Sequence, residues 1–264
     1  MPQAAGPVKI TVLGSGTSVG VPTIGCSCQV CTSRDLRDKR LRPSVLVSWD
    51  GHNVLVDTTP DLRQQVLRAG IDHLDAILYT HAHADHILGL DDVRPFNYRR
   101  KGGIPIYASA GDLETIRRSF AYIFTSGQSE SSRPRIEVHE FNGGPIRIHE
   151  LDFLPVKLAH GSGISYGFRF GRAAYLTDNS DIPPEAIELL TGLDVLFLDA
   201  LRYKPHPTHS TVDRSLQWVE QLAPRRAFFT HICHDLGHER AESLLPPQVR
   251  LAYDGLEVIV EAGE

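Results

Sequence analysis

A seven-residue stretch limits what this chain can fold into more than any other part of it. Residues 80–86 read Thr-His-Ala-His-Ala-Asp-His, so three imidazoles and one carboxylate fall within six positions. The apolar run 76–79 before them has the length of a strand, and residues 87–92 after them have the pattern of a helix start. This order predicts ligands on a loop at the carboxyl end of a strand, a usual place for a site in an open α/β fold.

The residue types of this motif favour a metal site. His81, His83, Asp85 and His86 bring four donors together, whereas an ordinary polar loop contains Gly, Asn or Ser. Imidazole and carboxylate together suit zinc, iron or manganese. A surface loop that is rich in histidine by chance is the alternative interpretation.

The length and composition of the chain predict one domain with a sizeable core. Of its 264 residues, 41 % are hydrophobic and 22 % are charged, and no Pro/Gly/Ser-rich segment divides it, so we expect a single domain over 1–264. The net charge of −5 gives no overall attraction to nucleic acid or to an anionic membrane. Residues 1–7 lack the pattern of a signal peptide, and no apolar run approaches about 18 residues, which together predict a cytoplasmic protein.

Strand and helix patterns alternate along the chain. Residues 14–20, after the first strand, hold three glycines, but the third is one place too late for a dinucleotide-binding loop, so we predict a tight turn near the site. Residues 35–42 are predicted as a solvated linker, residues 126–134 as a surface loop, and His52 as a solvent-facing turn residue. Strands are predicted at 8–13, 45–49, 53–57, 76–79, 104–107, 136–140, 146–151, 153–158, 167–170, 173–176, 195–198, 227–229 and 258–260, and helices at 60–68, 112–121, 183–190 and 212–221.

A donor side chain follows a predicted strand again and again. Histidines scattered over a surface would not be placed in this way, so the repeated placement predicts that these donors meet at one edge of the fold. The donors that end strands are Asp57, His81, His160, Asp178, Asp199 and His231.

Three of the four cysteines form a second cluster. Cys26, Cys28 and Cys31 have the spacing C-x-C-x2-C, and clustered cysteines in a cytoplasmic chain favour metal over disulfides. Three thiolates can occupy three corners of a tetrahedral zinc site, so a fourth ligand must come from elsewhere in the chain. Cys233 is interpreted as a small buried residue, with a ligand role as the alternative.

With these residues in view, the chain resembles the metallo-β-lactamase superfamily of metallohydrolases. The resemblance rests on the motif at 81–86 followed by His160, Asp178 and His231 in the order that the family shows, and it covers essentially the whole chain. It implies a four-layer αβ/βα sandwich, in which two mixed β-sheets face each other, helices lie outside and the site lies at one edge.

Within the superfamily, the cysteines narrow the resemblance further. The spacing of Cys26, Cys28 and Cys31, with His234 three residues after His231, is similar to the PhnP group of phosphoribosyl cyclic-phosphate phosphodiesterases. That resemblance implies a structural zinc ion held by Cys26, Cys28, Cys31 and His234.

The resemblance also implies two divalent metal ions, zinc, manganese or iron, in the active site. A water shared by two cations loses a proton near neutral pH, so a metal-bridging hydroxide is the expected nucleophile. One ion would take His81, His83 and His160, the other Asp85, His86 and His231, and Asp178 would bridge the two.

Further residues are expected to support the reaction. Asp57 would orient a ligand histidine, with capping of the following helix as the alternative. By the resemblance, His209 would protonate the leaving alcohol or contact phosphate, with a capping or surface role as the alternative. Arg94, Arg99 or Arg202 are expected to help bind phosphate.

The leading functional hypothesis is a metal-dependent phosphodiesterase for a small cyclic phosphate or nucleotide-like phosphodiester. A ribonuclease Z-like RNA-processing endonuclease is the second, but it would normally carry a basic, Gly-rich arm, and the net charge is −5. Hydrolysis of a β-lactam or thioester would leave the cysteines without a role. A non-catalytic, metal-stabilised binding protein is a further alternative, against which the complete ligand set argues. We expect a small phosphate-ester substrate, no membrane or nucleic-acid partner, and, from general frequencies alone, a homodimer.

Overall fold

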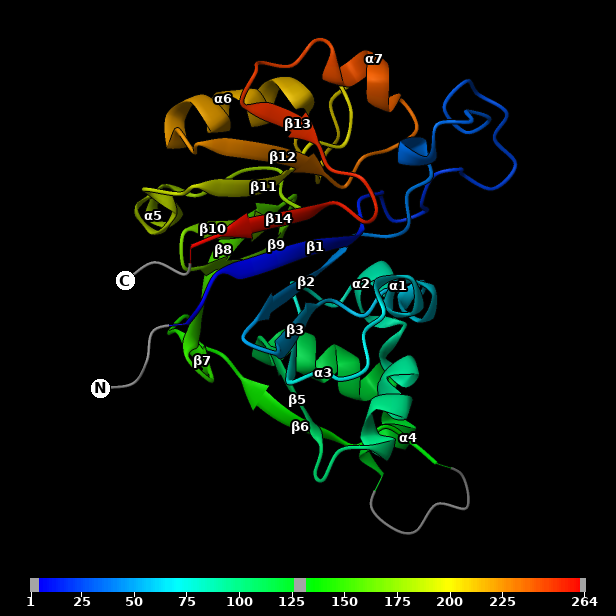
Figure 1. Cartoon of the computed structure of the whole chain (residues 1–264), viewed down its shortest axis with the longest axis vertical. Coiled ribbons are helices and arrows are strands. Elements are labelled where there is room, and N and C mark those ends of the chain that lie inside the picture. Colours follow the sequence, from blue (N-terminus) through cyan, green and yellow to red (C-terminus); the bar gives the residue numbers. More distant parts are fainter. Residues whose placement is uncertain (1–4, 126–131, 262–264) are drawn as a thin grey trace.

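Two seven-stranded β-sheets build the fold of this computed structural model, which describes residues 5–125 and 132–261 (Figure 1). The strand order of the first sheet is β14-β1-β2-β3-β4-β5-β6. Its strands β1 to β3 are antiparallel to one another, and β3 to β6 are parallel. The strands are β1 (Val8–Gly14), β2 (Ser44–Trp49), β3 (His52–Val56), β4 (Ala76–Leu78), β5 (Ile104–Ala108), β6 (Ile136–Glu140) and β14 (Glu257–Val260).

The second sheet has the order β13-β12-β11-β10-β9-β8-β7. It is also mixed, since β7 to β10 are antiparallel and β10 to β13 are parallel. Its strands are β7 (Ile146–Ile148), β8 (Leu151–His160), β9 (Gly163–Phe170), β10 (Ala173–Leu176), β11 (Val195–Asp199), β12 (Arg226–Thr230) and β13 (Val249–Leu251).

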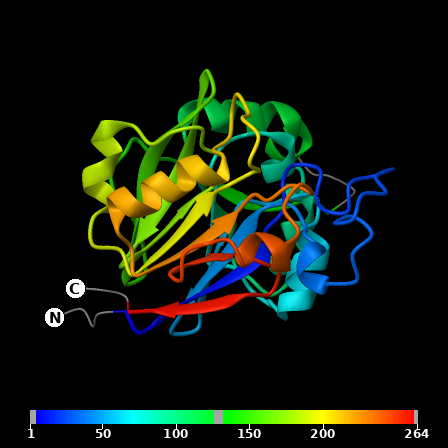
Figure 2. The ribbon, with the colours of Figure 1, turned by 90° about the horizontal axis from the view of Figure 1, so that it is seen from above.

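Helices cover the outer face of each sheet (Figures 1 and 2). Those on the first sheet are α1 (Leu62–Ala69), α2 (Ala84–Ile87), η2 (Leu90–Tyr98), α3 (Ala110–Ser119) and α4 (Ala121–Phe124). Those on the second are α5 (Pro184–Ile187), η3 (Glu188–Leu190), α6 (Val212–Leu222) and α7 (His238–Glu242), while η1 (Leu36–Asp38) lies between β1 and β2 in the chain. No helix of the described residues combines the length and the hydrophobicity needed to cross a membrane.

Three apolar layers result from strands that are buried on both faces. In β11, Phe197 points into the core between the sheets, while Leu196 packs toward the helices of the second sheet with Trp218. In β3, Val54 packs between the sheets, whereas Leu55 packs toward the helices of the first sheet. Successive side chains of a strand alternate between faces, so such strands read as continuous hydrophobic runs. The predicted four-layer αβ/βα sandwich is confirmed.

The structure corrects several local expectations. Asp85 and His86 belong to the short helix α2 and do not lie on a loop before it. β13 and α7 were not predicted, because a three-residue strand and a five-residue helix carry little periodicity. The predicted loop at 126–134 lies mostly outside the described residues.

The expectation of a solvated linker at 35–42 is wrong. Arg40 is only 1 % exposed, and its guanidinium donates to Ser15 Oγ and to the carbonyl oxygen of Ala252. A second guanidinium nitrogen lies 3.1 Å from His238 Nδ1. A charged segment is usually exposed, unless the fold supplies buried hydrogen-bond acceptors for its side chains. For Arg40, the turn after β1 and the chain after β13 supply these acceptors.

Candidate metal centre and active site

The ends of six strands supply the polar side chains of the site. Parallel strands present their carboxyl ends at the same edge of a sheet, and the two sheets contribute to one shared edge. Asp57 follows β3 and the motif 81–86 follows β4; His160 ends β8, Asp178 follows β10, Asp199 ends β11 and His231 follows β12.

Three imidazoles form the first group of donors. His81 Nε2 lies 2.8 Å from His83 Nδ1, and the His160 ring centroid lies 5.1 Å and 5.2 Å from the centroids of these two rings. One ligand atom of each residue lies within 4.8 Å of the others. His160 Nδ1 donates to the carbonyl oxygen of Thr208 at 2.9 Å, so its Nε2 carries the lone pair that a metal ion needs.

Asp85, His86, Asp178 and His231 form the second group, again with ligand atoms within 4.8 Å of one another. His86 Nε2 lies 3.2 Å from a carboxylate oxygen of Asp85 and 3.2 Å from Oδ2 of Asp178. The other oxygen of Asp178, Oδ1, lies 3.2 Å from His231 Nε2. The Asp178 carboxylate therefore faces both histidines of this group.

Unpartnered nitrogens show that these groups fit metal ions. His86 Nε2 and both ring nitrogens of His231 are buried and make no hydrogen bond, although carboxylate oxygens lie 3.2 Å from the two Nε2 atoms. A buried polar atom without a partner is costly, and it is rare in native proteins unless a bound ion or water satisfies it. The donor set and these nitrogens together match divalent transition-metal ions.

The electrostatic environment keeps several of the histidines neutral. Burial lowers the pKa of His81 well below its ordinary value and also lowers the pKa of His160 and His231. For His86, burial acts in the same direction, but the carboxylates of Asp178, Asp57 and Asp85 outweigh it and raise the pKa well above normal. Neutral imidazole is the form that binds a metal ion.

Asp57 makes the contact that its predicted role requires. Its carboxylate is fully buried, and Oδ2 lies 2.7 Å from His86 Nδ1. The amide and hydroxyl of Thr80 donate to the two carboxylate oxygens, each at 2.8 Å. These contacts fix the ring of His86 with Nε2 toward the second group of donors.

Three residues of the site have a strained backbone. Asp57, Asp178 and His231 have φ angles of 66°, 54° and 58°, in the left-handed region that residues other than glycine rarely adopt. Asp57 and His231 directly follow β3 and β12, and Asp178 lies two residues after the end of β10. Such conformations persist where surrounding packing holds them, and they cluster at functional sites.

His209 lies beside the second group of donors. Its ring stacks on the ring of His231 at a centroid distance of 4.5 Å, and its Nδ1 lies 2.7 Å from Oδ2 of the fully buried Asp199. Burial would lower the pKa of His209, but the hydrogen bond and charge of Asp199 raise it overall. The sequence marked Asp199 as a strand-end donor without assigning it a role, and the structure adds its contact with His209.

A cavity of about 440 Å³ opens onto His81, His83 and His160. Its walls include Asp112 of α3 and the turn between β8 and β9. The carboxylate of Asp112 accepts from the amide of Ala82 at 2.9 Å, a contact between α3 and the motif that was not predicted. This cavity is within the size range of small-molecule sites.

The arginines expected to help bind phosphate make other contacts. The Arg94 guanidinium donates to the carbonyl oxygen of Ser132 and pairs with Asp91. Arg202 donates to the carbonyl oxygens of Lys204 and Pro205. Arg94 thus joins η2 to the chain before β6, and Arg202 stabilises its own turn. The residues that line the cavity at the histidines do not include Arg94, Arg99 or Arg202.

The cysteine cluster is assembled as the resemblance implies. The sulfur atoms of Cys26, Cys28 and Cys31 lie 3.2, 3.7 and 3.4 Å from His234 Nδ1. A tetrahedral zinc with Zn–S bonds of about 2.3 Å and Zn–N bonds of about 2.0–2.1 Å would separate sulfur and nitrogen by about 3.5 Å. The four side chains therefore fit a closed zinc site.

The surroundings of the cluster suit thiolates. Backbone amides of Thr23 and Cys31 donate to the sulfurs of Cys31 and Cys28, and the second of these bonds is the main cause that lowers the pKa of Cys28 to about 7. Cys233 differs, because burial raises its pKa to about 11 and it is outside the group of four ligands. Its interpretation as a small buried residue agrees with this placement.

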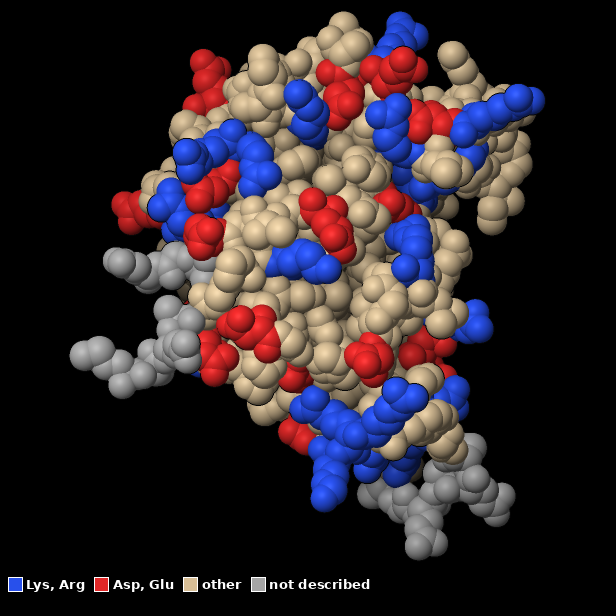
Figure 3. Space-filling view, in the orientation of Figure 1, with Lys and Arg blue, Asp and Glu red and all other residues tan. Residues whose placement is uncertain are grey.

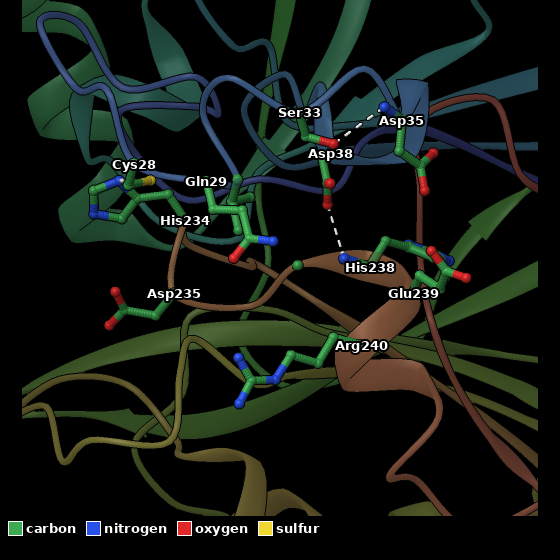
Figure 4. Close-up of a pocket in the computed structure, with 12 residues that line it drawn as sticks. Cys28, Gln29, Ser33, Asp35, Asp38, His234, Asp235, His238, Glu239 and Arg240 are labelled. Atoms are coloured by element: carbon green, nitrogen blue, oxygen red, sulfur yellow. Dashed lines mark hydrogen bonds between the residues drawn. The ribbon is translucent and has the colours of Figure 1, made fainter.

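The cluster connects two distant segments. Figure 4 shows Cys28 and His234 side by side at a cavity of about 400 Å³, with Asp38 and His238 across it. Close by, backbone hydrogen bonds join Ser15 and Thr17 to Ile232, directly after His231. The segment before β2 therefore holds the loop that carries His231.

Comparisons with known proteins agree with this fold. The family model described as "Beta-lactamase superfamily domain" matches residues 52–232, and the chain belongs to this superfamily. A solved structure described as "a New Diphosphatase from the PhnP Family" is 50 % identical and superposes with a TM-score of 0.93, covering 98 % of this chain and 100 % of that one. Within the superfamily, the chain is a member of the PhnP family. It has the metallo-β-lactamase fold, and its clustered histidines and aspartates could hold metal ions.

Two curated relatives are less complete matches. An "Octanoyltransferase" of Porphyromonas gingivalis is 39 % identical over 258 residues, which are 96 % of this chain and 52 % of that protein. The chain thus spans about half the length of that relative. A "Ribonuclease Z" of Mycobacterium marinum is 26 % identical over 217 residues, 74 % of this chain and 71 % of that enzyme.

Proposed function

We propose that this protein hydrolyses a P–O bond in a small phosphodiester, with two divalent metal ions in its active site. The observation that supports this most strongly is the pair of adjacent donor groups, in which Asp178 faces both histidines of the second group and buried imidazole nitrogens have no partner. The site residues predicted from the sequence supply both groups, and no further ligand is needed.

The metal ligands are assigned by this proposal. Two bound divalent ions would supply an activated water and positive charge for the phosphate oxygens. Five imidazoles and two carboxylates leave a formal charge of plus two on such a centre, which favours an anionic substrate. His81, His83 and His160 would hold one ion, Asp85, His86 and His231 the other, and Asp178 would lie between them.

His209 would act as the general acid. With Nδ1 directed at Asp199, the remaining nitrogen, Nε2, is the one that can give a proton to the leaving oxygen. Asp199 stabilises the protonated imidazole and fixes the orientation of its ring. This assignment needs no strong base on the protein, because the attacking water is activated separately.

The size and charge of the site favour a small substrate. The similar PhnP-family structure is that of a diphosphatase, whose name indicates a P–O–P linkage. A cyclic phosphate and a diphosphate diester each present a phosphorus with a single negative charge between two bridging oxygens. The cavity of about 440 Å³ suits such molecules.

RNA is less well matched by the surface. Figure 3 shows acidic and basic side chains interspersed over one face of the molecule, with basic side chains gathered near α4 and the start of β5. Near that end, Arg100 donates to the carbonyl oxygen of Leu74 and Arg135 to that of Asn97. Those guanidinium groups are used within the fold, whereas RNA binding needs cations that are free to contact phosphates.

A substrate panel tests the proposal. The metal-loaded protein is assayed with bis(p-nitrophenyl) phosphate, a ribose cyclic phosphate, a dinucleoside diphosphate and a precursor tRNA. We expect turnover of at least one small substrate and no trimming of the tRNA. Asp178→Asn should lower kcat/KM by more than about 100-fold, beyond the loss typical of outer-shell partners. Asp181→Asn, which changes a half-exposed carboxylate paired with Arg214, is the matched control.

Two results would contradict the proposal. If the protein binds its metals and turns over no small phosphodiester or diphosphate, it is better described as a metal-stabilised binding protein. If the tRNA is processed with a higher kcat/KM than every small substrate, the ribonuclease Z-like alternative is correct.

A further inference from the structure

Three side chains outside the active site meet at the opposite end of β3. His52 begins β3, Asp75 directly precedes β4, and His149 lies in the turn between β7 and β8. One ligand atom of each lies within 4.8 Å of the others. The group therefore joins the first sheet to the second, and His52 is a half-buried member of a cluster, not the solvent-facing turn residue that the sequence predicts.

The distances within this group match those of a metal site. Asp75 Oδ1 lies 3.2 Å from His149 Nε2 and 3.6 Å from His52 Nδ1. Ligands about 2.0–2.2 Å from a tetrahedral ion are separated by about 3.3–3.6 Å. The imidazole rings lie 3.7 Å apart, and the His149 side chain is 43 % exposed, so it has room to turn toward a shared ion.

Contacts within the protein position Asp75, His52 and the turn that carries His149. The amide of Asn53 donates to Asp75 Oδ2 at 2.7 Å, which directs Oδ1 toward the histidines. His149 has a φ of 50°, in the left-handed region, so the turn presents its side chain at the cost of backbone strain. The ring of Trp49 lies 5.6 Å from that of His52 and limits its movement.

The charge around the group favours a cation. A carboxylate oxygen of Glu150 lies 3.9 Å from His52 Nε2, in addition to the charge of Asp75. His73 is close to Asp75 but is already used, because its Nδ1 lies 2.7 Å from the carboxylate of Asp72 and its Nε2 contacts the carbonyl oxygen of Gly51. Two imidazoles and one carboxylate thus remain as ligands.

We propose that His52, Asp75 and His149 form a surface site for a divalent transition-metal ion such as Zn²⁺, separate from the active site. Two imidazoles and a carboxylate are a common protein ligand set for zinc, with water completing the coordination. A bound ion would tie β3 and the start of β4 to the turn between β7 and β8. With only three protein ligands at the surface, this site should lose its ion on dialysis more readily than the buried sites.

Calorimetric titration with Zn²⁺ tests the site on the metal-loaded protein after dialysis. His149→Asn removes the imidazole while keeping a residue that tolerates the left-handed conformation. Asp75→Asn removes the charge and keeps an acceptor for the Asn53 amide. His139→Gln, at an exposed histidine of β6 that stacks on Tyr107, is the matched control.

The wild-type protein and His139→Gln should bind one further Zn²⁺ per chain, and His149→Asn and Asp75→Asn should lose that equivalent. Circular dichroism should confirm that each variant is folded, and the turnover of bis(p-nitrophenyl) phosphate should be unchanged. The proposal is wrong if the wild type binds no further ion, or if both ligand variants bind it as the wild type does.

Discussion

At the scale of single residues, Asp57 contacts a metal-ligand candidate directly, since its Oδ2 lies 2.7 Å from Nδ1 of His86. Asp57→Asn removes the negative charge that orients and polarises this imidazole, so the metal affinity of the second donor group should fall about 10–100-fold. Competition with a chromogenic chelator measures this affinity. The control is Asp61→Asn, which changes a nearby carboxylate paired with Arg42 and should bind metal as the wild type does. If the two variants bind metal with equal affinity, Asp57 does not support the metal ligand His86.

The proposed role of His209 predicts a dependence on the leaving group. His209→Gln should lower kcat by about 10²–10⁴-fold for a substrate with an alkoxide leaving group, because that group needs a proton. The loss should be much smaller for p-nitrophenolate, which leaves without one. Steady-state kinetics with both substrates, at unchanged metal content, measures the difference. An equal loss for both leaving groups would show that His209 positions the substrate and does not protonate it.

At the scale of elements, Gly89 holds two segments of the site close together. It follows α2, and a Cβ atom at this position would lie 2.0 Å from the carbonyl oxygen of Thr59. Gly89→Ala should therefore destabilise the protein by about 1–3 kcal/mol, as overpacking does. Gly111→Ala in α3 is the control, because nothing lies within 4 Å of its Cβ and alanine favours a helix by about 0.5–1 kcal/mol. Urea unfolding compares the two, and similar midpoints would contradict the close approach.

The sequence predicts elements well where buried strands end in donor residues. β3, β4, β10 and β12 are parallel-sheet strands whose apolar runs stop at Asp57, His81, Asp178 and His231, so both the strand and its site residue are visible. The sequence does not reveal contacts that depend on tertiary packing. The burial of Arg40, for example, depends on acceptors supplied by distant segments.

At the scale of the whole molecule, the contact between Arg40 and His238 joins parts of the chain that are 198 residues apart. Burial, followed by the charge of Arg40, lowers the pKa of His238 to about 4. The unfolded chain, with a histidine pKa of about 6.5, therefore binds more protons than the folded protein between these values. The free energy of unfolding should fall as the pH drops from about 6.5 to about 4.

His238→Gln separates this effect from others, because glutamine can accept from Arg40 and does not titrate. The variant should lose less stability than the wild type over the same pH range, while protonation of the zinc thiolates affects both proteins equally. Urea unfolding at several pH values measures the slopes. Parallel slopes would show that His238 does not carry the pH dependence.

Quaternary structure and cell location depend on more than the packing of one chain. The homodimer was expected from general frequencies, and the cytoplasmic location from the pattern of residues 1–7, so both stay predictions. The superfamily and the ligand groups, in contrast, follow from residues whose chemistry and order have few alternatives. The contact of Asp199 with His209 required the structure, since only the folded chain places the two side chains 2.7 Å apart.

We expect two adjacent active-site ions and one separate structural zinc, bound by different residues. Elemental analysis of the dialysed protein tests it most directly, by the number of ions that stay bound to each chain. We expect three ions in the wild type, a loss of zinc alone from the cysteine cluster in His234→Ala, and a loss of active-site ions with the structural zinc retained in Asp178→Asn. A wild type that retains a single ion, or two variants that lose the same ion, would contradict it.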